Sequence, residues 1–183
     1  MCGVHGIFQR DGSHADPALL DLMGNVTIHR GPDDAGAFAD GPCAIGMRRL
    51  SIIDVAGGHQ PITTADGRYT IVCNGEIYNY RELRDELRAA GRQFSTHSDS
   101  EVLLQGYAAW GEAVFERLNG MYGFALWDSR ERRLLVGRDR LGIKPMYVLD
   151  DGRRLAFASE AKALLALPGV SRDIDRSATC GCP

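Results

Sequence analysis

The sequence lacks the features that mark a secreted or membrane-bound protein. Its first residues contain no apolar run long enough for a signal peptide, and no stretch approaches the ~20 apolar residues of a transmembrane helix. Five cysteines without a secretory signal favour reduced thiols over a disulfide framework. The sequence therefore predicts a cytoplasmic protein with no membrane partner.

An excess of one charge is also missing. The formal net charge is -3 at pH 7, so neither nucleic acid nor an anionic membrane is an expected partner.

Pairs of residues at the spacing of metal ligands are also scarce. Cys2 with His5, or Cys180 with Cys182, could form half of a zinc site, but no second pair stands at ligand spacing. We therefore expect no structural metal.

What the chain does contain is enough for one folded domain. Its 183 residues are 44% hydrophobic and 25% charged, which is ordinary for a globular protein with a substantial core. Expected strands over 121–127, 133–136, 145–149 and 155–158 follow one another as hairpins. Hairpin-rich strands around paired helices favour an α+β fold with antiparallel sheets over a doubly wound parallel sheet.

The first half of the chain predicts further elements. A short strand is expected over 3–10, and Asp16 should cap a helix that ends before Gly31-Pro32. The runs over 43–53 and 69–73 are typical of strands.

Two helix starts carry the pattern of a capping box. Asn79 is followed three residues later by Glu82, and Ser98 is followed by Glu101 at the same spacing. Gly91 is a natural end for the first of these helices, and a short helix is expected over 160–167.

Cys2 is the strongest candidate for chemistry. The initiator Met1 is usually removed before a small residue, which would leave Cys2 with a free α-amine beside its thiol. An α-amine titrates near ~8, so part of it is unprotonated at neutral pH and can accept the thiol proton. The resulting thiolate is the nucleophile, and no separate histidine is needed as a base. On its own, however, a cysteine at position 2 is more often an accident of the start codon.

Three polar segments interrupt the apolar pattern, at 48–51, 74–79 and 98–101. Each segment alone has a structural explanation: charges at a strand end, a turn and a helix cap, respectively. Together they match the groups of a small zwitterionic amide. An arginine fork binds a carboxylate in two parallel hydrogen bonds, and a carboxylate neutralises an ammonium group.

The second polar segment also contains the elements of an oxyanion hole. The Asn74 side-chain amide and the Gly75 backbone N–H would supply two donors, and glycine allows the backbone to approach closely. Spacing alone does not show that the three segments converge.

A series of segments, in order from residue 2 to about 175, resembles the glutaminase domain of glutamine-hydrolysing asparagine synthetases. The series comprises Met1-Cys2-Gly3, His29-Arg30-Gly31-Pro32-Asp33, Arg49-Leu50-Ser51-Ile52-Ile53-Asp54, Gln60-Pro61, Asn74-Gly75-Glu76-Ile77-Tyr78-Asn79, Ser98-Asp99-Ser100-Glu101, Gly120-Met121-Tyr122-Gly123-Phe124-Ala125, Gly137-Arg138-Asp139-Arg140-Leu141-Gly142-Ile143-Lys144-Pro145 and Ala158-Ser159-Glu160-Ala161-Lys162-Ala163-Leu164. Other class II amidotransferases share the Cys-Gly start and an Asn-Gly element. The Arg-Gly-Pro-Asp, Arg-Leu-Ser-Ile-Ile-Asp and Gly-Ile-Lys-Pro strings are similar to the asparagine-synthetase branch in particular.

The resemblance implies catalytic roles for three residues. Cys2 would attack the side-chain carboxamide of L-glutamine and form a glutamyl thioester, with its own α-amine as the base. Asn74 and Gly75 would form the oxyanion hole. Water would then release glutamate, and this half-reaction needs no cofactor.

The resemblance also implies the substrate-binding residues and the fold. Arg49 would bind the α-carboxylate of glutamine, and Glu76 with Asp99 would hold its α-ammonium. The implied fold is a four-layer αββα sandwich of the N-terminal-nucleophile (Ntn) hydrolase type, with two antiparallel sheets. This agrees with the α+β class predicted from the pattern.

The end of the sequence departs from the family. A glutamine amidotransferase domain is expected over 2–175 and a divergent tail over 176–183. Family members continue into a synthetase domain that uses ATP and Mg and carries a Ser-Gly-Gly-x-Asp-Ser loop, and this sequence contains no such loop.

Three alternatives stay open: an active stand-alone glutaminase, an ammonia-donating subunit for a separate synthetase or another amidotransferase, and an inactive truncated remnant. A zinc or redox module that uses Cys180 and Cys182 is a distant fourth. In the family one face of this domain is expected to be covered by the synthetase domain. Without that domain, the apolar surface of this face would be exposed. We therefore expect the chain to self-associate as a homo-oligomer or to require a partner.

Overall fold

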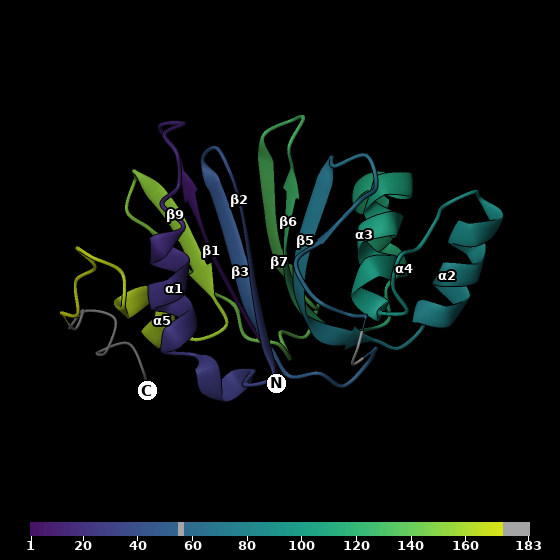
Figure 1. The fold of residues 1–183 in the computed structure, drawn as a ribbon, viewed down its shortest axis with the longest axis horizontal. Helices are drawn as coiled ribbons and strands as arrows, with labels where there is room; N and C mark the ends of the chain where they lie inside the picture. Colours follow the sequence, from purple (N-terminus) through teal and green to yellow (C-terminus); the bar gives the residue numbers. More distant parts are fainter. Residues whose placement is uncertain (55–56, 174–183) are drawn as a thin grey trace.

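The computed structural model describes residues 1–54 and 57–173, and within them nine strands form two antiparallel sheets that pack face to face (Figure 1). In the first sheet the order is β2 (Asp34–Asp40), β3 (Cys43–Arg49), β1 (Gly3–Gln9), β9 (Arg154–Ala158) and β8 (Tyr147–Asp150). In the second sheet the order is β4 (Ile62–Thr63), β5 (Tyr69–Ile77), β6 (Gly120–Asp128) and β7 (Arg133–Arg138).

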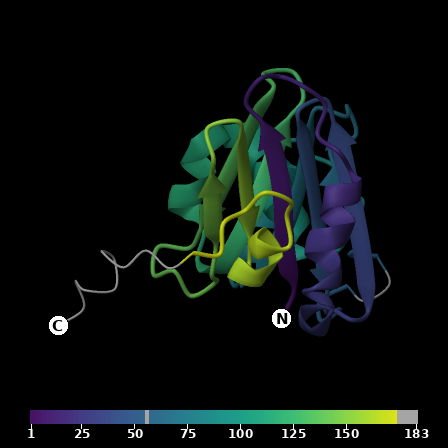
Figure 2. The same ribbon diagram turned by 90° about the vertical axis from the view of Figure 1, so that its left-hand side faces the viewer.

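Helices cover the outer face of each sheet. The first sheet carries α1 (Ala18–Asn25) and α5 (Ala161–Leu165), which lie side by side in Figure 2. The second sheet carries α3 (Asp99–Trp110), with α2 (Tyr80–Ala89) packed against α3 on the outside and α4 (Val114–Arg117) beside it. The 3₁₀ turns η1 (Ile28–Arg30) and η2 (Gly111–Ala113) complete the chain path. This layering confirms the predicted αββα sandwich.

Strand alternation explains why the sheets are buried on both faces. On β5, Val72 points between the sheets, whereas Ile71 and Cys73 pack in the cluster under α3. The space between the sheets holds Trp127, which is fully buried and donates its indole N–H to the Asp40 carboxylate at 2.8 Å. A buried Trp places a large apolar area in the core while its polar atom keeps a partner.

Two strands end four residues away from the predicted position. β3 ends at Arg49 instead of continuing to residue 53, and Ile52 beyond it is 73% exposed. β5 continues to Ile77, so Asn74 and Glu76 lie within the strand and not in a turn that leads to a helix. The reason is pairing: this polar stretch lies opposite residues 121–123 of β6 along a continuous ladder.

One of the two predicted capping boxes is wrong. Asn79 stands at the start of α2 without capping it, because its side chain instead bonds to the backbone of Arg117 and Asn119. Ser98 does cap α3, accepting the amide of Glu101 at 3.2 Å. The Glu101 carboxylate binds backbone amides of the preceding loop and leaves the box half formed.

The predicted hairpins are present as β6–β7 and β8–β9, although they belong to different sheets. Strands β2 and β4 and helix α4 were not predicted. The tail over 176–183, with Cys180 and Cys182, lies outside the described residues. In the described part of the chain no helix has the length and apolarity needed to span a membrane.

Candidate active site

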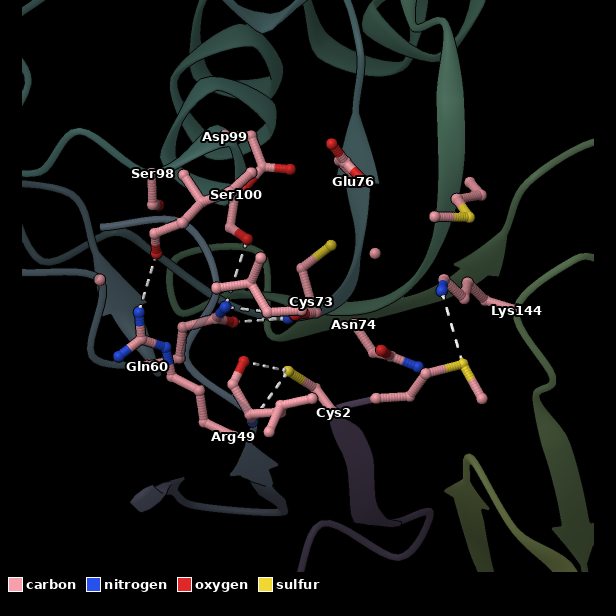
Figure 3. Close-up of a pocket in the computed structure, with 17 residues that line it drawn as sticks. Cys2, Arg49, Gln60, Cys73, Asn74, Glu76, Ser98, Asp99, Ser100 and Lys144 are labelled. Carbon is pink, nitrogen blue, oxygen red and sulfur yellow. Dashed lines mark hydrogen bonds between the residues drawn. The ribbon is translucent and has the colours of Figure 1, made fainter. Parts of the chain in front are cut away.

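The three polar segments of the sequence meet in one pocket beside the start of the chain. Strand β1 begins there, β3 ends there, and β5 and α3 form the opposite side. All six predicted site residues line this pocket (Figure 3): Cys2, Arg49, Asn74, Gly75, Glu76 and Asp99.

Cys2 immediately precedes β1 and is half-buried. Its Sγ accepts the amide of Leu50 at 3.3 Å and lies 3.5 Å from the Leu50 carbonyl oxygen. Met1 also lines the pocket, and in the full chain the nitrogen of Cys2 is an amide bonded to it. Removal of Met1 would therefore convert this nitrogen into an amine at the pocket wall.

The main chain of Cys2 is fixed by a buried arginine that was not predicted from the sequence. Arg30 donates from Nε to the Cys2 carbonyl at 2.9 Å and from Nη1 to Glu160 at 3.0 Å. Desolvation raises the pKa of Glu160, but hydrogen bonds from Lys162, Arg30 and His29 outweigh it and lower that pKa to about 2. The carboxylate thus stays charged and anchors Arg30 at neutral pH. The only sequence signal for Arg30 was its place in the Arg-Gly-Pro-Asp string.

Arg49 is the last residue of β3, and its side chain is buried. Its Nη2 donates to the carbonyls of Ile53 at 3.0 Å and Asp54 at 2.8 Å. These bonds fold the segment after β3 around the guanidinium and hold that group at the pocket wall.

Asn74 supplies a buried donor without a partner. Its side chain is 2% exposed, and Nδ2 forms no hydrogen bond with any described residue. Buried polar atoms are nearly always paired, so an unpaired donor that lines a pocket is the arrangement expected of an oxyanion site. The next residue must be glycine, because a Cβ at Gly75 would lie 2.3 Å from the Met121 carbonyl oxygen.

The two acidic residues lie on the side of the pocket away from Cys2 (Figure 3). Asp99 begins α3 and accepts the Ile77 amide at 2.8 Å. Burial raises the pKa of Asp99 against the opposing effect of this hydrogen bond, and the charge of Glu76 adds to the increase. A bound cation would therefore be stabilised here, since it would relieve the repulsion between the two carboxylates.

Gln60 and Cys73 also line the pocket. The Gln60 side chain bonds to both backbone polar groups of Cys73, at 2.7 Å to the amide and 3.2 Å to the carbonyl, and to the Ser100 hydroxyl at 3.2 Å. It thereby ties β5 to the first turn of α3. Burial raises the pKa of the Cys73 thiol, which keeps it protonated.

One further cation lines the pocket. Lys144 is 6% exposed, and its Nζ donates to the Met1 Sδ at 3.7 Å (Figure 3). Within residues 1–54 and 57–173, no three His, Cys, Asp or Glu side chains gather in a way that could hold a metal ion.

The fold places the chain in a known structural class. It superposes with a TM-score of 0.75 on glutamine phosphoribosylpyrophosphate amidotransferase from B. subtilis in complex with ADP and GMP, at 24% identity over 90% of this chain and 43% of that one. A structure described as the allosteric regulatory enzyme of purine biosynthesis gives 0.77 at 23% identity, with the same coverage. The architecture is that of the Ntn amidotransferases.

Within this class the chain belongs to the family described as glutamine amidotransferase domain, which matches residues 1–180. It is 40% identical to glutamine-hydrolyzing asparagine synthetase 3 of Bacillus subtilis, over 97% of this chain and 29% of that protein. It is also 40% identical to glutamine-hydrolyzing asparagine synthetase B of Escherichia coli, over 90% of this chain and 30% of that protein. The resemblance predicted from the motifs is confirmed, and the chain spans about 30% of the length of these relatives.

Proposed function

We propose that this chain hydrolyses L-glutamine to glutamate and ammonia through a thioester on Cys2. The observation that carries the proposal is the unpartnered, buried Nδ2 of Asn74 in the same pocket as the thiol of Cys2. Family membership supports the choice of glutamine as the amide.

The charged residues of the pocket suit the two ends of glutamine. Arg49 would bind the α-carboxylate as a bidentate fork, exchanging part of its bonding to the loop carbonyls. Glu76 and Asp99 would hold the α-ammonium, which offsets the unfavourable burial of the Asp99 charge. Bound in this way, glutamine would present its side-chain amide to Cys2.

Catalysis would begin after removal of Met1. The α-amine of Cys2 takes the thiol proton, and the thiolate attacks the carboxamide carbon. The developing oxyanion accepts hydrogen bonds from Asn74 Nδ2 and the Gly75 N–H. The protonated amine then gives its proton to the departing ammonia, and water hydrolyses the thioester to glutamate. None of these steps needs a metal or an organic cofactor.

We also propose that the ammonia serves asparagine synthesis on a synthetase domain or subunit, in the cytoplasm. The relatives carry asparagine synthetase in their names and are about three times as long as the matched region. An apolar hollow between the edge strands β7 and β8 supports a covering partner, since Val136, Met146 and the 56% exposed Val148 line it.

Four measurements test these proposals. Intact mass should show loss of Met1, and the purified chain should release glutamate from glutamine without ATP. A chain that keeps Met1 and is fully active would contradict the mechanism, while an inactive, processed chain would identify a remnant. Size-exclusion chromatography with light scattering should show self-association, and aspartate with ATP should yield no asparagine. A stable monomer at high concentration would contradict the partner proposal.

A further inference from the structure

Lys144 is an unusual cation in this chain. Only two of the 21 basic residues are lysines, at positions 144 and 162, and all others are arginines. The side chain of Lys162 is 48% exposed, whereas Lys144 is buried in the wall of the pocket. Burying an ammonium group costs free energy unless a partner compensates it, so a buried lysine at a reactive site requires an explanation.

No carboxylate among the described residues neutralises this ammonium. Its one hydrogen bond there is to the thioether of Met1, which is a weak acceptor. The acid nearest in sequence, Asp139, is engaged with the backbone amides of Tyr122, Ile143 and Lys144. Among the described residues, the single partner of the Lys144 ammonium is therefore the residue that processing would remove.

The contact with Met1 places the ammonium close to the nitrogen of Cys2. Met1 is bonded to that nitrogen, and its Sδ is 3.7 Å from Lys144 Nζ. With standard bond lengths, the two nitrogens are no more than roughly 10 Å apart. Figure 3 shows Lys144 across Cys2 from Arg49.

We propose that, once Met1 is removed, the Lys144 ammonium lies beside the α-amine of Cys2 and keeps that amine unprotonated through like-charge repulsion. The inference rests on the proposed function, because it concerns the base of that reaction. Lys144 is then a positioning residue that acts through its charge.

The other charged or titratable groups around the pocket come from η1, β3, β5 and α3: Arg30, Arg49, Cys73, Glu76 and Asp99. Arg30 donates a hydrogen bond to the Cys2 carbonyl, and its positive charge also disfavours protonation of the α-amine. The Glu76 and Asp99 carboxylates favour protonation, but they lie on the side of the pocket away from Cys2. The Cys73 thiol stays neutral, because burial raises its pKa.

The test is the pH dependence of kcat/KM for glutamine, measured on Met1-free protein. Lys144→Met removes the charge at similar length and should move the acidic limb up by about one pH unit, because two like charges within roughly 10 Å of each other at a partly buried site disfavour each other. Activity at pH 6.5 should fall about tenfold and recover at high pH. Lys144→Arg should keep the wild-type profile.

A matched control removes a positive charge far from the pocket. Arg153 lies in the exposed turn between β8 and β9. Its neighbour Arg154 pairs with Gln9, at the opposite end of β1 from Cys2, so Arg153→Met changes a charge far from the pocket. Its profile should equal that of the wild type. Folding of each variant is checked by circular dichroism and thermal unfolding.

Either an unshifted profile in folded Lys144→Met, or a loss of activity that is the same at every pH, would overturn the inference. If that variant does not fold, an NMR titration of wild-type protein labelled with ¹³C-cysteine decides instead. Because the Arg30 charge is paired with Glu160, an α-amine pKa clearly below ~8 supports the role of Lys144, and one at or above ~8 removes it. Wild-type protein that retains Met1 or lacks glutaminase activity would defeat the proposed function, and this inference with it.

Discussion

The two sides of the pocket present the same functional group, a thiol, in opposite environments. Cys2, on the side formed by the first sheet, is half-buried at the end of a strand, where its Sγ accepts a backbone amide. Cys73, on the side formed by the second sheet, is 3% exposed in the middle of β5, and burial raises the pKa of its thiol. Reactivity in this pocket is therefore set by position in the fold and not by residue type.

The difference extends beyond the cysteines. The first sheet contributes groups at or next to strand ends, such as Arg49. The second sheet contributes groups fixed by a complete ladder and a capped helix, such as Asn74 and Asp99. We infer that the first side carries the reacting atoms, while the second provides a preorganised surface against which the charge develops.

The largest expected effect separates the two thiols. Cys2→Ala should abolish glutamine hydrolysis, because no other described group in the pocket offers a thiol with access to substrate. Cys73→Ala should keep activity within about threefold and cost roughly 1 kcal/mol of stability, since a small buried group is lost. Steady-state glutamate release and thermal unfolding measure both. Loss of turnover in Cys73→Ala, with the fold intact, would contradict the comparison.

Asn74→Ala tests the proposed oxyanion donor on the second side of the pocket. Removing one oxyanion donor should lower kcat by about 100- to 1000-fold with little change in KM. Asn79→Ala is the matched control, because that amide bonds only to the backbone of Arg117 and Asn119 among the described residues. If Asn74→Ala kept kcat within about threefold, the oxyanion role would be wrong.

Arg49→Lys tests the binding part of the first side. A lysine cannot reproduce the bidentate fork, so KM for glutamine should rise at least about tenfold while kcat changes less. Arg48→Lys is the control one residue away, because Arg48 bonds to the carbonyl of Gly24 and the side chain of Asn25, outside the pocket. An unchanged KM in Arg49→Lys would remove Arg49 from the substrate site.

The sequence allowed much of this site to be predicted, because residue type carries chemistry. Cys2 and the Asn74-Gly75 pair have functional interpretations without any structure. The convergence of the three segments could not be derived from spacing, because it depends on which strand ends meet when two sheets stack. The full length of β5 could not be predicted for a related reason. Residues 74–76 include two polar residues and a glycine, so they resemble a turn until their pairing with β6 is known.

The supporting residues were harder to predict. Gln60, Arg30 and Lys144 make long-range contacts, and apart from their places in family motifs each resembles an ordinary polar residue in the sequence. The Asn79 capping box failed because a tertiary contact competed with the local one. Local patterns therefore predicted the candidate reacting groups, while the residues that hold them required the fold.

The smallest expected effect concerns how the second side is kept rigid. Ser98 caps α3 directly before Asp99, so Ser98→Ala should destabilise the protein by about 1 kcal/mol. The expected rise in KM for glutamine is only about twofold, because Asp99 keeps its bond from the Ile77 amide. Ser98→Thr should restore stability, since threonine is also a good cap. Chemical denaturation and steady-state kinetics measure both quantities. A large rise in KM in Ser98→Ala that Ser98→Thr does not reverse would mean that Ser98 contacts the substrate itself, and that the second side is more than a fixed support.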